Sequence, residues 1–179
     1  MASPPWRANG IVAEEVGFTA AKAELLRLTR MSCYAALATS SLDGMPQVAP
    51  LRYTVTNDFE LVMGTLRTSR KYANLETNDR VAVVIWDDEM SIQIEGRFDE
   101  PDPTDEQRLR THFANELPRE AQLRTERPTH FFFRITPTWA RCSDFSDEPP
   151  RVLTLDFIAQ TETRGTFPVL TDGRQRPGL

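Results

Sequence analysis

The chain alternates short apolar runs with turn signals, and this alternation limits the folds that it can adopt. Asp43-Gly44, Asn57-Asp58 and Asp87-Asp88 each separate two such runs. Dipeptides of this kind favour tight turns between antiparallel neighbours. The pattern therefore predicts a mainly β protein, a barrel or a sandwich decorated with a few helices. The predicted strands cover residues 33–39, 48–56, 59–65, 81–86, 91–98, 129–136 and 138–145, and 152–157 is a candidate for one more.

Three segments are predicted to be helical, and they divide the chain into a domain with two tails. Apolar side chains fall on one helical face in 18–30, and shorter helices are expected in 68–78 and 104–115. Residues 118–128 are polar and are expected to be irregular or briefly helical. The predicted organisation is an N-terminal arm over 1–17, one domain over 18–158 and a flexible tail over 159–179.

Composition excludes several classes of protein. The 179 residues carry a net charge of -5, which argues against a nucleic-acid binder because phosphate contacts need a basic face. The apolar runs are too short to cross a membrane, and no apolar signal segment opens the chain, so we expect a cytoplasmic protein. Two cysteines, Cys33 and Cys142, and two histidines, His112 and His130, show no metal-ligand spacing, so no metal site is predicted.

The densest group of functional side chains runs from Gly64 to Lys71. Gly64 ends a predicted strand and lets the backbone approach a ligand closely, and Thr65 adds a hydroxyl. Ser69, or its neighbour Thr68, is a suitable N-cap for the following helix, whose first N–H groups attract anions. Arg70 and Lys71 add two positive charges. This combination is what a phosphate monoester requires, although a surface helix with a basic first turn explains the spacing equally well.

Two further positions stand out on later strands. Residues 91–98 alternate cleanly, with Ile92 and Ile94 on one face, so Gln93 points away from the core, either to solvent or to a polar ring system. Trp139 follows the run Phe131-Phe132-Phe133 on a late strand. Apolar residues on both faces of that strand predict that it is covered twice, once by the core and once by a partner chain.

Taken together, these residues resemble the pyridoxamine 5'-phosphate oxidase-like family of flavin-binding split barrels. The resemblance covers about residues 35–98 and continues more weakly to 141. Its most specific parts are Gly64-Thr65-x-x-x-Ser69-Arg70-Lys71-x-x-x-Leu75-x-x-Asn78 and the stretch Gln93-Ile-Glu-Gly96.

The resemblance implies a six-stranded antiparallel split β-barrel that forms a homodimer, with FMN in grooves between the subunits. Arg70 and Lys71 would bind the flavin phosphate, assisted by Ser69, with Gly64 and Thr65 at the same end. The other implied cofactor-binding residues are Pro50, Leu51, Arg52 and Tyr53 beside the ring, largely through their backbone, Gln93 at the ring system, and Trp139 from either subunit.

The chain departs from the true oxidase in the part of the site that binds vitamin B6. Ala49 stands where the oxidase has an arginine. His112, Glu116 and Ala121 replace the tyrosine, arginine and serine that hold the substrate phosphate. The C-terminal Arg-Leu-His-Asp-Arg motif is also missing. Authentic pyridoxamine phosphate oxidase activity is therefore not predicted.

The function predicted from the sequence is an FMN-dependent oxidoreductase that acts on a small-molecule substrate. No catalytic residue is assigned, and Arg52 and Tyr53 are the nearest candidates for proton transfer. Two alternatives remain: an F420-dependent reductase on the same fold, and a flavin-binding module without turnover. Haem binding is a minor alternative, because histidines are scarce.

Overall fold

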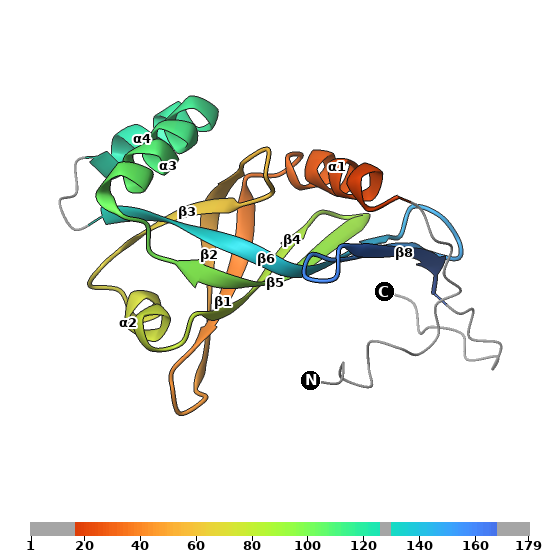
Figure 1. The fold of residues 1–179 in the computed structure, drawn as a ribbon, viewed down its shortest axis with the longest axis horizontal. Helices are drawn as coiled ribbons and strands as arrows, with labels where there is room; N and C mark the ends of the chain where they lie inside the picture. The colour runs from red at the N-terminus through yellow and green to blue at the C-terminus, as the bar shows by residue number, and fades with distance from the viewer. Residues whose placement is uncertain (1–16, 126–129, 168–179) are drawn as a thin grey trace.

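The computed structural model describes residues 17–125 and 130–167, so the predicted arm, apart from Gly17, lies outside the described residues. Four helices and eight strands follow in the order shown in Figure 1. The helices are α1 (Phe18–Thr29), α2 (Arg70–Thr77), α3 (Pro103–Glu116) and α4 (Pro118–Thr125). The strands are β1 (Tyr34–Ser40), β2 (Pro46–Val55), β3 (Leu61–Leu66), β4 (Arg80–Trp86), β5 (Met90–Asp99), β6 (His130–Asp144), β7 (Arg151–Asp156) and β8 (Thr161–Thr166).

The first six strands form a closed antiparallel barrel, as predicted. Their order is β3-β2-β1-β4-β5-β6, and β3 pairs again with β6 to close the ring. Strands β7 and β8 continue the sheet beyond β6. The turn signals lie where the sequence places them, since the Asp43-Gly44 turn joins β1 to β2 with Ser40 opposite Pro46.

The barrel interior is filled by alternate residues of its strands. Leu37, Tyr53, Met63, Ile85 and Ile94 are almost fully buried there. Their neighbours along each strand point outwards, in keeping with the period of two that governs a β-strand. The outward row is unusually apolar on β1 and β4, a point that bears on the candidate site.

Residues 130–144 form one continuous strand, whereas the sequence predicted two strands separated by Pro137. The pairing with β5 shifts register at this point, because Glu95 lies opposite Trp139 and Gly96 lies opposite Pro137. The extra residue, Thr138, forms a β-bulge, one of the few places where a proline without an N–H group fits inside a sheet. The first half of β6 pairs with β3 and the second half with β7.

The prediction of a flexible tail is wrong for residues 161–166. These residues form β8, which pairs with all of β7 from Asp156↔Thr161 to Arg151↔Thr166. Its sequence, Thr-Glu-Thr-Arg-Gly-Thr, has little apolar character, so the order of this strand comes from main-chain hydrogen bonds to β7. The rest of the predicted tail, 168–179, lies outside the described residues.

The sequence predicted that a partner chain covers the second face of the late strand. At Phe132, this face is covered by a helix of the same chain instead. Phe132 packs with Val62 of β3 and with Leu109 and Phe113 of α3. The rings of Phe113 and Phe132 lie 5.0 Å apart. Helix α3 therefore closes this face of the barrel by itself.

Helices α1 and α2 lie against different parts of the sheet. Helix α1 contacts β7 and β8, and α2 contacts β1 (Figure 1). Ala21 and Leu25 are the fully buried apolar residues of α1. Within the described residues, no helix combines the length and the apolar composition that crossing a membrane requires.

The bulge makes Gly96 a sensitive position. A Cβ atom there would lie 2.7 Å from Ile135 Cγ2 and 2.8 Å from the carbonyl oxygen of Thr136, which is backbone and cannot move aside cheaply. We predict that Gly96→Ala lowers the free energy of unfolding by about 1–3 kcal/mol, as overpacking does. Urea denaturation measures the difference.

The control is Gly17→Ala, where a Cβ atom would meet nothing within 4 Å. Gly17 precedes α1, so this change should cost less than about 1 kcal/mol. Equal losses for the two variants would contradict the assignment of the bulge as a steric constraint.

Candidate functional site

The predicted phosphate cluster lies at the start of α2. Ser69 is the N-cap of this helix, and its side chain accepts a hydrogen bond from the backbone N–H of Tyr72 at 3.3 Å. Asn78 is the C-cap. The predicted boundaries are therefore correct to within two residues. The backbone N–H groups of Arg70 and Lys71, the first two residues of the helix, have no partner within the helix and can bind an anion.

Three of the predicted side chains gather at this point. The hydroxyl groups of Thr65 and Ser69 lie 3.1 Å apart, and Lys71 Nζ donates to Thr65 Oγ1 at 3.4 Å. Lys71 is half-buried, and burial lowers the pKa of its ammonium group. Arg70 is exposed beside it and has no ion-pair partner in the described part of the chain. The group offers two cations and two hydroxyls with no acidic residue in the first turn of the helix.

Gly64 allows a close approach to another side chain. A Cβ atom at this position would overlap the imidazole ring of His130, and would lie 3.4 Å from the ring of Phe132. Gly64 lies opposite Phe132 in the β3–β6 pairing. The space that the glycine leaves is thus filled by His130, so glycine is required here for packing whether or not a ligand lies nearby.

Polar side chains fix α2 against the β1–β2 hairpin. The side-chain amide of Asn74, which is 6% exposed, donates to Thr39 Oγ1 at 3.1 Å and to Gln47 Oε1 at 3.3 Å. Asn78 Nδ2 donates to Ser40 Oγ at 2.8 Å. These contacts hold the basic end of α2 in one orientation. The sequence indicated only the helix-terminal role of Asn78 and gave no signal for Asn74.

A second group of predicted residues lies on the outer face of the barrel. Pro50, Ala36, Val84 and Gln93 are paired in succession across β2, β1, β4 and β5, so their side chains form one row. Trp139 belongs to the next row, opposite Glu95. Gln93 and Trp139 line one open groove of about 280 Å³, together with Ala36, Ala38, Val48, Ala82, Val83, Val84, Ile94 and Glu95. The sheet thus brings Pro50, Gln93 and Trp139 to one surface.

Arg52 lies at the end of the same outer face but is already engaged. Its guanidinium group stacks on the ring of Tyr34 at 3.6 Å, forms an ion pair with Glu120 at 3.5 Å and contacts the thiol of Cys33. Tyr34 was not singled out in the sequence. Counting back from the Asp43-Gly44 turn would have found it, because hairpin pairing places Tyr34 directly opposite Arg52.

Tyr53 and Leu51 point to the inside of the barrel. Tyr53 is 1% exposed, its hydroxyl donates to the carbonyl oxygen of Thr29, and burial raises its pKa above the usual value. This burial argues against proton transfer by the Tyr53 hydroxyl at the outer face. Leu51 packs against the core. Both residues can reach a ligand on the outer face only through their backbone.

Comparison of the sequence with family models identifies the family of this protein. The model for pyridoxamine 5'-phosphate oxidase matches residues 21–143, which include most of α1, every element from β1 to α4 and most of β6. The chain belongs to the pyridoxamine 5'-phosphate oxidase family. The sequence resemblance is thereby confirmed. No curated protein sequence gives a significant match.

Solved structures with the same fold bind different prosthetic groups. A pyridoxamine 5'-phosphate oxidase-related, FMN-binding protein from Nostoc punctiforme PCC 73102 has a TM-score of 0.62 at 15% identity, covering 93% of this chain and 99% of that one. The haem storage protein HutZ from Vibrio cholerae has a TM-score of 0.55 at 16% identity, covering 65% of this chain and 87% of that one.

A haem-binding protein from Mycobacterium smegmatis has a TM-score of 0.65 at 13% identity, covering 78% of this chain but only 59% of that one. At these identities the likeness shows a shared fold and nothing more. Within the described ranges of this chain, no group of three or more His, Cys, Asp or Glu side chains is placed to hold a metal ion.

Lys71 should destabilise the protein when no anion is bound. Its ammonium group loses hydration on burial and lies in the first turn of a helix, where a cation opposes the helix dipole. We predict that Lys71→Met raises the free energy of unfolding of the cofactor-free protein at neutral pH, measured by urea denaturation. Arg70→Met is the control and should give a smaller gain, because Arg70 is exposed and opposes the helix dipole without losing its hydration.

The pH dependence of the stability gained by Lys71→Met follows from the lowered pKa of Lys71. Lys71 releases its proton at a lower pH in the native protein than in the unfolded chain, so the native state is destabilised only while the lysine is charged. The advantage of Lys71→Met should therefore shrink as the pH rises from the native pKa of Lys71 towards its unfolded value. A gain that stays constant over this range would contradict the burial argument.

Proposed function

We propose that this member of the family is an FMN-binding oxidoreductase that works as a homodimer on a small-molecule substrate. The observation that carries the proposal is the cluster of Thr65, Ser69, Arg70 and Lys71 at the N-terminus of α2. Charge-assisted hydrogen bonds contribute about 1.5–3 kcal/mol each. Two or three of them supply a large share of the binding energy of a micromolar ligand.

The residues of this cluster fit the phosphate group of FMN. The hydroxyls of Thr65 and Ser69 are 3.1 Å apart, and the ammonium group of Lys71 lies next to them with its hydration reduced by burial. A dianion placed there would be paired with Lys71 and with the free guanidinium group of Arg70. When bound, FMN supplies the redox chemistry, and the protein contributes position and electrostatics.

The outer face of the barrel supports both the ring-binding part of the proposal and the dimer. Gln93 offers a side-chain amide to polar ring atoms, beside the indole of Trp139. Around this groove, Val48 is 67% exposed and Trp86 is 54% exposed. Contiguous apolar surface of this kind marks an interface. We assign it to a second copy of the chain, with the flavin held between the subunits.

We propose that the substrate is not a vitamin B6 phosphate. Glu116 is exposed at the end of α3, and Ala121 packs beside the cluster that surrounds Phe132. His112 offers only an imidazole. These three residues provide none of the positive charge that a second phosphate would need, and Glu116 would repel it.

The chromophore distinguishes this proposal from its alternatives. Mass spectrometry of the small molecule released from the purified protein identifies FMN, F420 or haem. FMN supports the proposal, whereas F420 or haem would replace it, haem being the group bound by two of the structural neighbours. Stopped-flow reduction by NADH or NADPH, followed by reoxidation by oxygen, separates an enzyme from a passive flavin binder.

The phosphate cluster gives a direct prediction. Changing Arg70 and Lys71 together to Ala should weaken FMN binding at least about tenfold, equivalent to about 1.4 kcal/mol, because both phosphate cations are lost. Fluorescence titration of FMN measures the affinity. The control is Lys22→Ala with Arg80→Ala, which removes the same charge from α1 and β4. Unchanged affinity in a folded Arg70/Lys71 variant would exclude the site.

The dimer gives a second prediction. Val48→Asp places a charge on the exposed apolar face and should convert the dimer to a monomer with weakened flavin binding, as measured by light scattering coupled to size-exclusion chromatography. Leu123→Asp is the matched control, since Leu123 is 59% exposed on α4. A wild-type monomer that binds FMN tightly would contradict the shared groove.

A further inference from the structure

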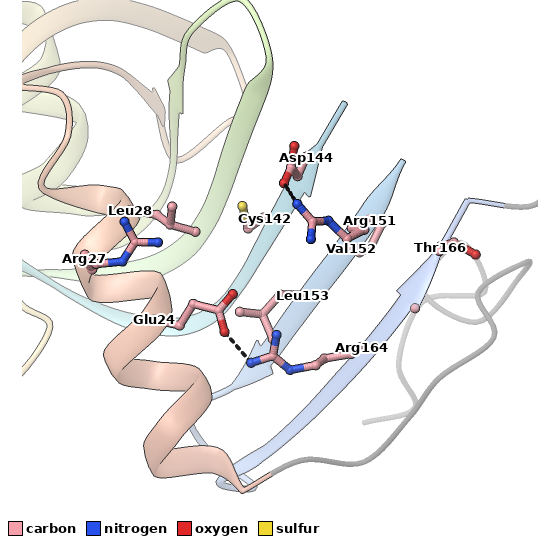
Figure 2. A pocket seen from close by; sticks show the side chains of 11 residues that line it. Glu24, Arg27, Leu28, Cys142, Asp144, Arg151, Val152, Leu153, Arg164 and Thr166 are labelled. Atoms are coloured by element: carbon pink, nitrogen blue, oxygen red, sulfur yellow. Dashed lines mark hydrogen bonds and ion pairs between the residues drawn. The ribbon is translucent and has the colours of Figure 1, made fainter. Parts of the chain in front are cut away.

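A second cavity lies between α1 and the outer strands of the sheet, away from the residues assigned to the flavin. Its volume is about 590 Å³, which is within the range of small-molecule sites. Figure 2 shows the lining side chains, which come from α1 on one side and from β6, β7 and β8 on the other. None of its lining residues belongs to the phosphate cluster or to the groove of Gln93 and Trp139.

Three arginines from three different elements line the cavity. They are Arg27 in the last turn of α1, Arg151 on β7 and Arg164 on β8. The lining also includes two carboxylates, Glu24 and Asp144, so three positive and two negative side chains leave one net positive charge. That balance is opposite in sign to the chain as a whole, whose net charge is -5.

Two of the arginines are already paired with carboxylates, and the third is not. Arg164 pairs with Glu24, and Arg151 pairs with Asp144 at 2.8 Å and with Asp147 at 3.1 Å. The side chain of Arg151 is 62% exposed, and exposed pairs contribute little stability. Arg27 has no ion-pair partner among the described residues. A bound anion therefore gains the guanidinium group of Arg27 without breaking an ion pair among the described residues.

The rest of the wall is mainly apolar. It includes Leu28 of α1, Cys142 of β6 and Leu153 of β7 (Figure 2). Cys142 is 4% exposed, and burial raises the pKa of its thiol to about 11, so it is an uncharged wall residue at neutral pH. The cavity thus combines a cationic rim with an apolar interior.

We propose that the cavity between α1 and β6–β8 binds a small organic anion, with its acidic group on Arg27 and its apolar body against Leu28 and Leu153. The acidic group is an oxyanion, either a carboxylate or a phosphate, since a guanidinium fork binds both in a bidentate manner. This binding site is independent of the proposed flavin function.

The test is a titration of the full-length protein followed by amide ¹H–¹⁵N NMR, with 3-phenylpropionate and phenyl phosphate as probes. Both probes carry the same ring, so the tighter one identifies the preferred acidic group. Saturable shifts are expected at the amides of Leu28, Cys142 and Leu153. Inorganic phosphate should bind more weakly than phenyl phosphate, because it cannot use the apolar wall.

Variants decide whether the cavity is responsible. Arg27→Ala should weaken binding about tenfold, whereas Arg30→Ala should not. Arg30 ends the same helix but hydrogen-bonds Asn57 at 2.6 Å instead of lining the cavity. In the Arg70/Lys71 double variant, the shifts at Leu28, Cys142 and Leu153 should saturate as in the wild type, which separates this site from the flavin phosphate site.

Three results would overturn the proposal. Shifts that grow without saturation for both probes would show that no site exists. Equal weakening of probe binding by Arg27→Ala and Arg30→Ala would show that the variants act only by changing the overall charge of the protein. Shifts confined to β3 and α2 would show that the probes occupy the phosphate cluster, in which case the flavin proposal would stand and this one would fall.

Discussion

The pairing of β3 with β6 is the interaction on which the rest of this structure depends. Six residue pairs, from Leu61↔Ile135 to Leu66↔His130, join segments that are far apart in the sequence. Such a contact forms only after a long loop has been closed, at a cost in chain entropy. Once formed, it removes two sheet edges and encloses the core. It also places Thr65 at the end of β3, where α2 begins.

The bulge in β6 links the closed barrel to the strands that follow it. Because Thr138 is an extra residue opposite Glu95 and Gly96, the strand turns from the barrel towards β7 without ending. One strand therefore belongs to two parts of the molecule. Its first half supports the barrel and is covered by α3, and its second half carries Trp139 to the outer groove and Cys142 to the cavity under α1.

The electrostatics of the α2 terminus explain why we favour an anion there. Arg70 and Lys71 stand in the first turn of the helix, without an acidic residue to compensate them, and Lys71 is half-buried. Each of these features is unfavourable in the cofactor-free protein. A bound phosphate turns both into favourable interactions. The ion pairs around the second cavity differ, because Arg151 and Arg164 are already compensated by carboxylates.

The sequence by itself determined the elements whose signals are local. The turn dipeptides, the alternation in 91–98 and the N-cap at Ser69 all depend on neighbours within a few residues, and the structure has them where they were predicted. The order of β8, the continuity of the strand through Pro137 and the cover of Phe132 by α3 were decided by tertiary structure. Each depends on a neighbour outside the segment itself: β7 for β8, β5 opposite the bulge for Pro137, and Phe113 for Phe132. The same holds for the inward side chain of Tyr53 and for the cavity of Arg27, since a side chain's surroundings are set by which strands and helices become neighbours, and that is fixed only when the barrel closes.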